Sequence, residues 1–369
     1  MAEYLIRLAT EADNEALCSL CELPMPGSIS LAFPRRPAFF DSNAIQVTHL
    51  ALYVLEHRQS KQVEGMFSVG SRPVYVNGQP KEVPYFSDLR LHPNARGGRA
   101  LFELCEFAAQ QDWMQNSFGQ TVVFADNTTM LSLIQKLKQR GKRNKWFLYH
   151  EAGDLVSWMI SLRKKVNLKI PAGIELRKAT AQDMPKLQLF WEKEASVIQF
   201  APVYDFSKLG EAYYKGLEPS NYYLAFEMGE LVACCGIWDQ SNFRQTLVHS
   251  YAGALRYLRP FINLLSGFWG DIELPPAGKE LAYLNVHTLA VTGRRPDLLL
   301  ALIQAIRSDY SGSGYAYLLL GMDAFDPLQE AMKQIPNKRS IQGKHYLVSG
   351  QEQFQVPMKR PFYLEAARI

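Results

Sequence analysis

The sequence lacks several features that would place it in a specialised class of protein. No apolar run reaches the roughly 18 residues that a membrane-spanning helix needs, so we expect no membrane partner. The formal net charge is only +4 over 369 residues, which does not by itself favour nucleic acid. The first residues carry acids and no long apolar core, unlike a secretory signal. These absences predict a cytoplasmic protein.

Cysteine is also scarce, with five residues in the chain. An odd number without a signal sequence fits a reducing compartment. Cys18 and Cys21 form a C-x-x-C in a predicted helix, but no second Cys or His pair stands at the spacing of zinc ligands. We therefore interpret both as small buried side chains, with zinc or redox chemistry as the alternative, and expect no metal site.

An internal repeat organises an otherwise ordinary globular composition. The length predicts two domains, and residues 6–17 return as residues 176–187. The matching residues are Arg7, Ala9, Thr10, Asp13 and Leu17, which recur as Arg177, Ala179, Thr180, Asp183 and Leu187. Each copy predicts a strand followed by a helix with a threonine cap and an aspartate in its first turn. Convergent cap chemistry is the alternative to duplication.

The repeat places a boundary in residues 164–173, a basic segment with a proline and a glycine. We therefore predict domains at 1–166 and 167–369. Alternating and helical apolar patterns predict antiparallel strands and helices in both, an α/β protein of the α+β type. Tight turns are expected at Asn77-Gly78 and near Gly229. Residues 145–162 are predicted to form a hairpin turning at 151–154, and residues 360–369 a late strand.

The stretch "LRLHPNARGGRAL" (residues 89–101) joins a predicted strand to a predicted helix. A helix N-terminus exposes unpaired amides and carries partial positive charge. Glycines allow close approach of the backbone, and Arg96 and Arg99 add permanent charge. Pyrophosphate suits such a site. A plain turn is the alternative.

The same stretch resembles the acyl-CoA loop of the Gcn5-related N-acetyltransferases (GNATs), in which a strand often ending in His-Pro precedes Arg/Gln-x-x-Gly-x-Gly/Ala and a helix. "IRLATEAD" resembles the opening strand and helix of that family. The resemblance covers most of residues 4–160 and, more faintly, residues 174–349. It implies two GNAT-like domains, each with a mixed, mainly antiparallel sheet flanked by helices.

The resemblance further implies an acyl-CoA-dependent N-acyltransferase that moves an acyl group, most simply acetyl, from coenzyme A to a small-molecule or peptide amine. Acetyl-CoA would be the co-substrate. The residues implied to bind it are Leu89, Leu91, Arg96, Gly97, Gly98, Arg99, Ala100 and Asn127. Asn127 stands where the family often has an asparagine after its fifth strand.

Three departures from the family pattern qualify this prediction. The loop lacks a further glycine near Arg99 or Leu101. Ile134 stands where the family often has a tyrosine acid. The equivalent second loop, "TGRRPDLL", has one glycine and a proline, Pro296, where a donor amide is wanted. We therefore expect the second domain to be degenerate and to bind coenzyme poorly.

Acyl transfer to an amine needs a base, and Asp88 and His287 are the candidate catalytic residues. Asp88 precedes the strand at residues 89–91, whose bulged or splayed backbone would supply an oxyanion amide. The structural alternative for Asp88 is an ion pair with Arg90 or Arg72. His287 shares a strand face with Asn285, and a hydrogen-bonded strand histidine is the alternative. Glu64 and Glu82 are weaker base candidates.

Two basic segments have open interpretations. Arg35 and Arg36 either bind an acidic acceptor or the coenzyme phosphate, or lie in a surface loop. Residues 136–145 read as a solvated helix end, with the coenzyme 3′-phosphate or RNA as alternatives.

Two other functions compete with acyl transfer. One is non-catalytic binding of acyl-CoA or of a partner, and the other is aminoacyl transfer from charged tRNA. No nucleic-acid motif supports RNA as a partner. A homo-oligomer stays open.

Overall fold

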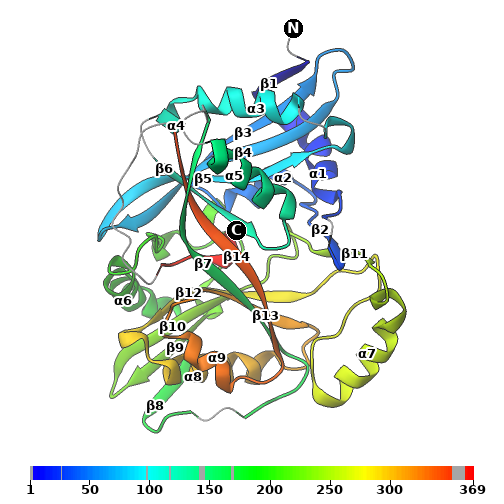
Figure 1. The fold of residues 1–369 in the computed structure, drawn as a ribbon. Helices are drawn as coiled ribbons and strands as arrows, with labels where there is room; N and C mark the ends of the chain where they lie inside the picture. Colours follow the sequence, from blue (N-terminus) through cyan, green and yellow to red (C-terminus); the bar gives the residue numbers. More distant parts are fainter. Residues whose placement is uncertain are drawn as a thin grey trace.

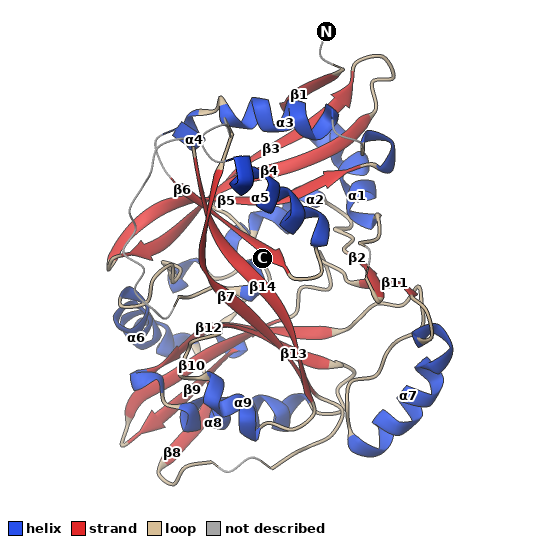
Figure 2. Ribbon diagram, viewed as in Figure 1, coloured by secondary structure: helices blue, strands red, loops and turns tan. Residues whose placement is uncertain are grey.

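The computed structural model describes residues 3–25, 27–96, 99–115, 118–140, 146–167, 170–350 and 362–369. Most of its strands join into one continuous sheet with helices against both faces (Figure 2). None of the described helices is long and apolar enough to cross a membrane.

The first half of the chain supplies one end of the sheet and five helices within the described residues. Its strands are β1 (Tyr4–Leu8), β2 (Ile29–Ala32), β3 (His49–His57), β4 (Val63–Val76), β5 (Gln79–Leu91), β6 (Phe118–Phe124) and β7 (Leu148–Ser161). Its helices are α1 (Asn14–Glu22), α2 (Phe39–Ala44), α3 (Arg99–Ala109), α4 (Asp112–Gln115) and α5 (Thr128–Arg140).

The second half follows a similar order of elements. Its strands are β8 (Ile174–Lys178), β9 (Tyr222–Glu227), β10 (Glu230–Trp238), β11 (Leu247–Tyr251), β12 (Tyr283–Val291), β13 (Tyr317–Asp323) and β14 (Lys338–Ser349). Its helices are α6 (Met184–Ser196), α7 (Leu255–Trp269), α8 (Pro296–Tyr310) and α9 (Gln329–Gln334). The C-terminal segment, residues 362–369, ends in a 3-10 turn at Ala366–Arg368.

The two halves exchange their last strands at the centre of the sheet (Figure 1). The order of the 12 strands is β1-β3-β4-β5-β6-β14-β7-β13-β12-β10-β9-β8. Strand β14, from the second half, pairs with β6 of the first, while β7 pairs with β13 of the second. Strands β7 and β14 also pair with each other along most of their length. The two halves are therefore joined by backbone hydrogen bonds. The part of the sheet that each half forms includes a strand from the other half.

The repeat noticed in the sequence builds the same polar cluster twice. Arg7 donates to both carboxylate oxygens of Asp13, at 2.8 and 2.9 Å. Arg177 does the same to Asp183, at 2.7 and 2.6 Å. In each copy the aspartate also accepts the backbone N–H of the preceding threonine at 2.8 Å, which fixes the first turn of the helix. The five matching residues of the repeat therefore form the same local structure in both copies, as duplication and convergent cap chemistry both predict.

Helices cover opposite faces of the sheet in each half. In the first, α1 and α2 pack on one face of β3 and β4, and α3 packs on the other face. In the second, α8 and α9 cover one face of β9, β10, β12 and β13, and α6 covers the opposite one. A mixed, mainly antiparallel sheet between helical layers is the predicted fold class, and the structure confirms it.

Two sequence predictions of local structure are wrong. Residues 145–162 do not turn back at 151–154, because β7 runs straight through as one strand between β13 and β14. Residues 362–369 form a single bridge and a 3-10 turn instead of a strand. The expected tight turns at Asn77-Gly78 and Gly229 are confirmed, with the positive φ angles that such turns require.

Candidate functional site

Strand β5 separates from β6 in the first half. Among the residues that the structure describes, these two parallel strands pair at Tyr85 and Gln120 alone, although β5 continues to Leu91. The hydroxyl of Thr121 donates to the Phe86 carbonyl at 2.9 Å, one residue beyond the pair. Past this point the backbone of β5 faces a gap between the strands.

A bulge lies in β5 beside this gap. The register with β4 shifts by one residue between the Ser68–Ser87 and Met66–Arg90 pairs, which leaves an extra residue in β5. Asp88 has φ of 55°, a left-handed conformation that aspartate tolerates better than most side chains. Among the described residues, neither Asp88 nor Leu89 has a strand partner in β4. The bulge thus leaves two consecutive residues of β5 without a paired residue in β4, at the edge of the gap.

The Asp88 carboxylate is buried in a polar cluster. Its Oδ1 accepts a hydrogen bond from Arg35 at 2.6 Å, and its Oδ2 accepts one from Asn43 Nδ2 at 3.1 Å. The hydroxyl of Ser68 donates to Oδ2 at 3.2 Å. Burial alone would raise the pKa of Asp88, but the guanidinium groups of Arg35 and Arg244 lower it below its ordinary value. Both oxygens therefore have partners and the carboxylate is a weak base.

The sequence predicted the wrong partner for this carboxylate. Arg90 and Arg72 were the expected ion-pair partners of Asp88, and the partner is Arg35. Arg72 instead donates to the backbone carbonyls of Gln46 and Arg368. The structural alternative for Asp88, an ion pair, is therefore right in kind but not in partner. The role of Asp88 as a general base stays a prediction.

The loop after β5 turns into α3. The ring of His92 accepts the Asn94 amide at 3.3 Å and starts a 3-10 turn. Arg96 is exposed, and its Nε donates to the Leu91 carbonyl at 3.2 Å. The predicted binding residues Gly97 and Gly98 lie outside the described residues. Helix α3 begins at Arg99, a short distance along the chain from the bulge at Asp88.

The first residues of α3 divide into an exposed and a buried side. Arg99 is exposed and pairs with Glu103 at 3.0 Å. Ala100 is buried against the sheet. Upstream in β5, Leu89 is 40% exposed and Leu91 is partly buried. The predicted binding residues that the structure describes in this stretch thus belong to the end of β5, the 3-10 turn that follows it and the first turn of α3.

The second half repeats the bulge in β12 but covers it. The pairing with β10 shifts by one residue next to His287, and Thr288 has φ of 51°. The amide of Thr288 donates to Oε2 of Glu365 at 2.8 Å, and the amide of Leu289 donates to the Tyr363 hydroxyl at 2.9 Å. The C-terminal segment therefore accepts hydrogen bonds from both amides of this bulge. The corresponding amides of Asp88 and Leu89 in the first half meet no side-chain acceptor among the described residues.

The same segment fills the gap beside β13. Strands β12 and β13 pair in parallel at three positions and then separate, as β5 and β6 do. Ala366 packs so closely on Gly321 of β13 that a Cβ there would lie 2.6 Å from the alanine methyl. The Phe362 amide donates to the Asp323 carboxylate at 3.0 Å. Sequence reasoning missed this insertion, whose signal is the apolar and aromatic content of residues 361–364.

Comparisons with known proteins bear on this arrangement. No family model matches the chain, and no curated protein matches it either. Its structure is similar to the crystal structure of a GCN5-related N-acetyltransferase from Sphaerobacter thermophilus, with a TM-score of 0.56 and 15% identity. That match covers 98% of this chain and 99% of the other. The chain has the GNAT fold.

A second structure with the GNAT fold is also similar. It is the GCN5-related glucosamine N-acetyltransferase region of a fungal multi-domain GH3 β-N-acetylglucosaminidase, with a TM-score of 0.59 and 10% identity. This match covers 94% of the present chain but only 38% of the fungal one. Identities this low bear on the fold of the chain alone.

His287, the second predicted base, lies inside the second half of the GNAT fold. It is 1% exposed, and its ring lies over Gly236 and against the rings of Tyr222 and Trp238. Its Nδ1 lies 2.7 Å from the Thr288 hydroxyl. Burial lowers the pKa of His287 to about 3, so the ring is neutral. These contacts favour the structural reading, and a role as base stays a prediction.

Asn127 and Ile134 mark the helix that follows β6. The Asn127 side-chain oxygen accepts the Met130 amide at 3.1 Å, so the residue caps α5. Ile134 is 2% exposed and packs with Cys105 in the cluster beneath α3 and α5. At the position where GNAT proteins often have a tyrosine, this chain therefore has a buried aliphatic side chain with no acidic proton.

The two weaker base candidates have another contact or lie at the surface. Glu64 accepts the Tyr4 hydroxyl at 3.3 Å, and Glu82 is exposed. Neither faces the bulge through a described hydrogen bond.

The two neighbouring arginines of the first loop separate. Arg35 points inward to Asp88, while Arg36 pairs at the surface with Glu15 and Glu22. The surface-loop alternative fits Arg36. Arg35 fits neither a surface loop nor an exposed anion site, because it is buried in the cluster around Asp88.

The cysteines are all free thiols and all buried. Within the described residues, no group of His, Cys, Asp or Glu side chains is arranged to hold a metal ion. In the basic segment, Lys138 pairs with Glu151 at 2.8 Å, while residues 141–145 lie outside the described residues.

Proposed function

We propose that this chain is an acyl-CoA-dependent N-acyltransferase, most simply an N-acetyltransferase, whose first half holds the coenzyme. The observation that supports this proposal most strongly is the difference between the bulge in β5 and the bulge in β12. The bulge amides at Thr288 and Leu289 are bonded to the C-terminal segment, whereas no described side chain accepts from those at Asp88 and Leu89. A chain whose own C-terminal segment fills the gap beside β13 is suited to one ligand, in the related gap beside β5.

The gap beside β5 would offer the groups that acyl transfer needs. The Leu89 amide would donate to the thioester oxygen as negative charge develops on it. The attacking amine loses a proton to a base, its nitrogen bonds to the carbonyl carbon, and the carbon–sulfur bond breaks to release the coenzyme thiolate. The start of α3, with Arg96 and Arg99, would meet the coenzyme diphosphate.

The proposal extends to the organisation of the chain. Residues 1–166 and 167–369 would be two related domains that exchange their last strands, with the second one unable to bind coenzyme because its gap is filled. A cytoplasmic location agrees with the buried, unpaired thiols. The acceptor is an amine of unassigned structure.

A substitution in the loop tests this function. Gly97→Glu places a carboxylate where the diphosphate is expected, so acetyl-CoA affinity should fall at least about 100-fold, a change of about 2.7 kcal/mol. Calorimetric titration of wild type and variant measures this directly. Gly267→Glu is the matched control, because a Cβ at Gly267 meets no atom within 4 Å. Equal affinities of wild type and Gly97→Glu would remove the loop from the proposal.

A second candidate, acyl-CoA binding without turnover, is favoured by Ile134, which offers no proton to the leaving thiolate. The two candidates differ in thiol release from acetyl-CoA in the presence of a panel of amines. Release above the uncatalysed rate that is lost in Gly97→Glu supports the transferase. Tight binding without release supports the binding protein.

A further inference from the structure

Helix α7 is turned with its polar side towards the protein. The Asn263 side chain donates to the Leu274 carbonyl at 2.8 Å and accepts the Leu274 amide at 2.9 Å. Arg259 donates to the same carbonyl at 3.1 Å. Ser266 is buried and accepts from Arg163 at 3.2 Å. Hydrogen bonds to the adjoining loop thus fix the rotation of this helix about its own axis.

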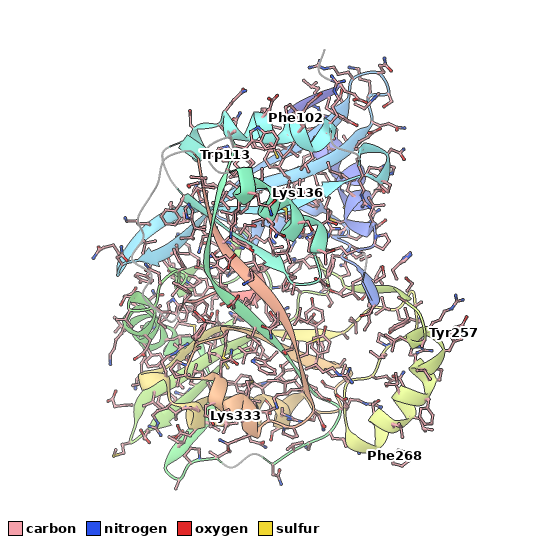
Figure 3. The ribbon with its side chains drawn as sticks, in the orientation of Figure 1. Phe102, Trp113, Lys136, Tyr257, Phe268 and Lys333 are labelled. Carbon is pink, nitrogen blue, oxygen red and sulfur yellow. The ribbon has the colours of Figure 1, made fainter. Side chains whose placement is uncertain are left out.

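The opposite side of α7 is apolar and exposed to solvent. Helix α7 lies at the periphery of the molecule (Figure 1), and Tyr257 and Phe268 point away from the body (Figure 3). The exposed fractions are 78% for Tyr257, 50% for Leu258, 60% for Phe261, 61% for Leu264 and 72% for Phe268. Scattered apolar side chains are ordinary on a surface, but a contiguous row on one helix indicates an interface.

The spacing of this row is that of a helix–helix contact. We call Tyr257, Phe261, Leu264 and Phe268 the α7 seam. Steps of four, three and four residues are those of alternating a and d positions in a heptad. The pattern is symmetric about the midpoint between Phe261 and Leu264. An antiparallel second copy would therefore set Tyr257 against Phe268 and Phe261 against Leu264, as a two-fold axis requires.

The area and charge of the seam also favour a second copy. With aromatic side chains burying about 150–250 Å² each when covered, the exposed row offers roughly 600 Å² per copy. Two copies would bury about 1,200 Å², the lower limit of a stable interface. The only charged residues in α7 are Arg256 and Arg259, and Arg259 bonds inward. A helix with so few outward cations is poorly suited to an anionic membrane surface.

We propose that the α7 seam is a homodimer interface, in which α7 helices of two chains pack antiparallel across a two-fold axis. Pro260 lies off the seam and does not interrupt it. The interface is remote from the gap beside β5, so its test does not depend on the proposed transferase activity.

Sedimentation velocity of the full chain across a concentration series tests the interface. Wild type should sediment at twice the 41.9 kDa chain mass. Leu264→Glu should weaken dimerisation at least about 100-fold, because each dimer then carries two charges in its seam. Leu189→Glu is the matched control, since Leu189 is a 69% exposed helical leucine on α6. It should leave the dimer intact.

Disulfide cross-linking tests the antiparallel arrangement without introducing a charge into the α7 seam. Phe261→Cys and Leu264→Cys chains, when mixed, should form a disulfide faster than either variant alone. The native thiols are buried and do not compete. A monomeric wild type, a dimer that Leu264→Glu leaves intact, or no preference in the mixture would overturn the proposal. So would a monomer that sediments with phosphatidylserine vesicles through α7, which would assign the seam to a membrane.

Discussion

The free energy of unfolding should fall as the pH is lowered from about 6.5 to about 4.5. Burial lowers the pKa of His287 and of His345 to about 3, and both residues are at most 1% exposed. The unfolded chain binds a proton at each near pH 6.5, whereas the folded chain does not, so stability is fully present above that pH and declines below it. Two such groups give a slope of up to about 2.7 kcal/mol per pH unit.

Glu365 opposes this slope. Burial raises the pKa of its carboxyl, so the folded state holds this proton more tightly than the unfolded state does. Its contribution is present below the ordinary glutamate pKa and is lost as the pH rises through the folded value. The net slope is therefore expected between about 1.4 and 2.7 kcal/mol per pH unit.

Urea unfolding at several pH values measures the slope. The double variant His287→Gln/His345→Gln removes both titrating rings and should lose the positive slope. The control His49→Gln/His249→Gln changes two exposed histidines and should keep it. A double variant at positions 287 and 345 with the wild-type slope would mean that these rings are not neutral in the folded protein.

Asp88→Asn should lower the free energy of unfolding by about 3–5 kcal/mol, because it leaves the Arg35 guanidinium buried without its counter-charge. The two side chains are only 7% and 6% exposed, and their closest N–O distance is 2.6 Å. Urea unfolding at neutral pH measures the loss. Adding Arg35→Met to this variant should restore part of the stability, since the unpaired charge is then removed as well.

Glu15→Gln is the control for a surface pair, because Glu15 is 74% exposed beside Arg36, and it should change stability little. The same Asp88→Asn protein also tests the predicted catalytic role. A general base would show as a loss of thiol release in protein that remains folded. Unchanged stability with lost activity would contradict the structural account of Asp88.

Local chemistry could be predicted from the sequence where neighbours in the chain decide it. Thr10 and Asp13 lie three residues apart, so their hydrogen bonds follow from helix-start geometry alone. The turn at Asn77-Gly78 follows from the φ angles that these two residues accept. The strand-to-helix loop at residues 89–101 also rests on local patterns.

Long-range pairing could not be predicted in the same way. Residues 151–154 contain turn-forming residues, yet they extend as a strand because β14 pairs with them. Arg35 reaches Asp88 from a loop far away in the sequence, so charge pattern alone favoured the nearer Arg90. The C-terminal segment enters the gap beside β13 through Tyr363, Glu365 and Ala366, and nothing local marks their partners.

The stoichiometry of acetyl-CoA binding tests the central claim most directly. Calorimetric titration of the wild-type chain should give one site per chain, because the C-terminal segment fills the gap beside β13 and would leave the gap beside β5 as the coenzyme site. Two sites per chain, or a single site that Gly97→Glu leaves unchanged, would contradict this account.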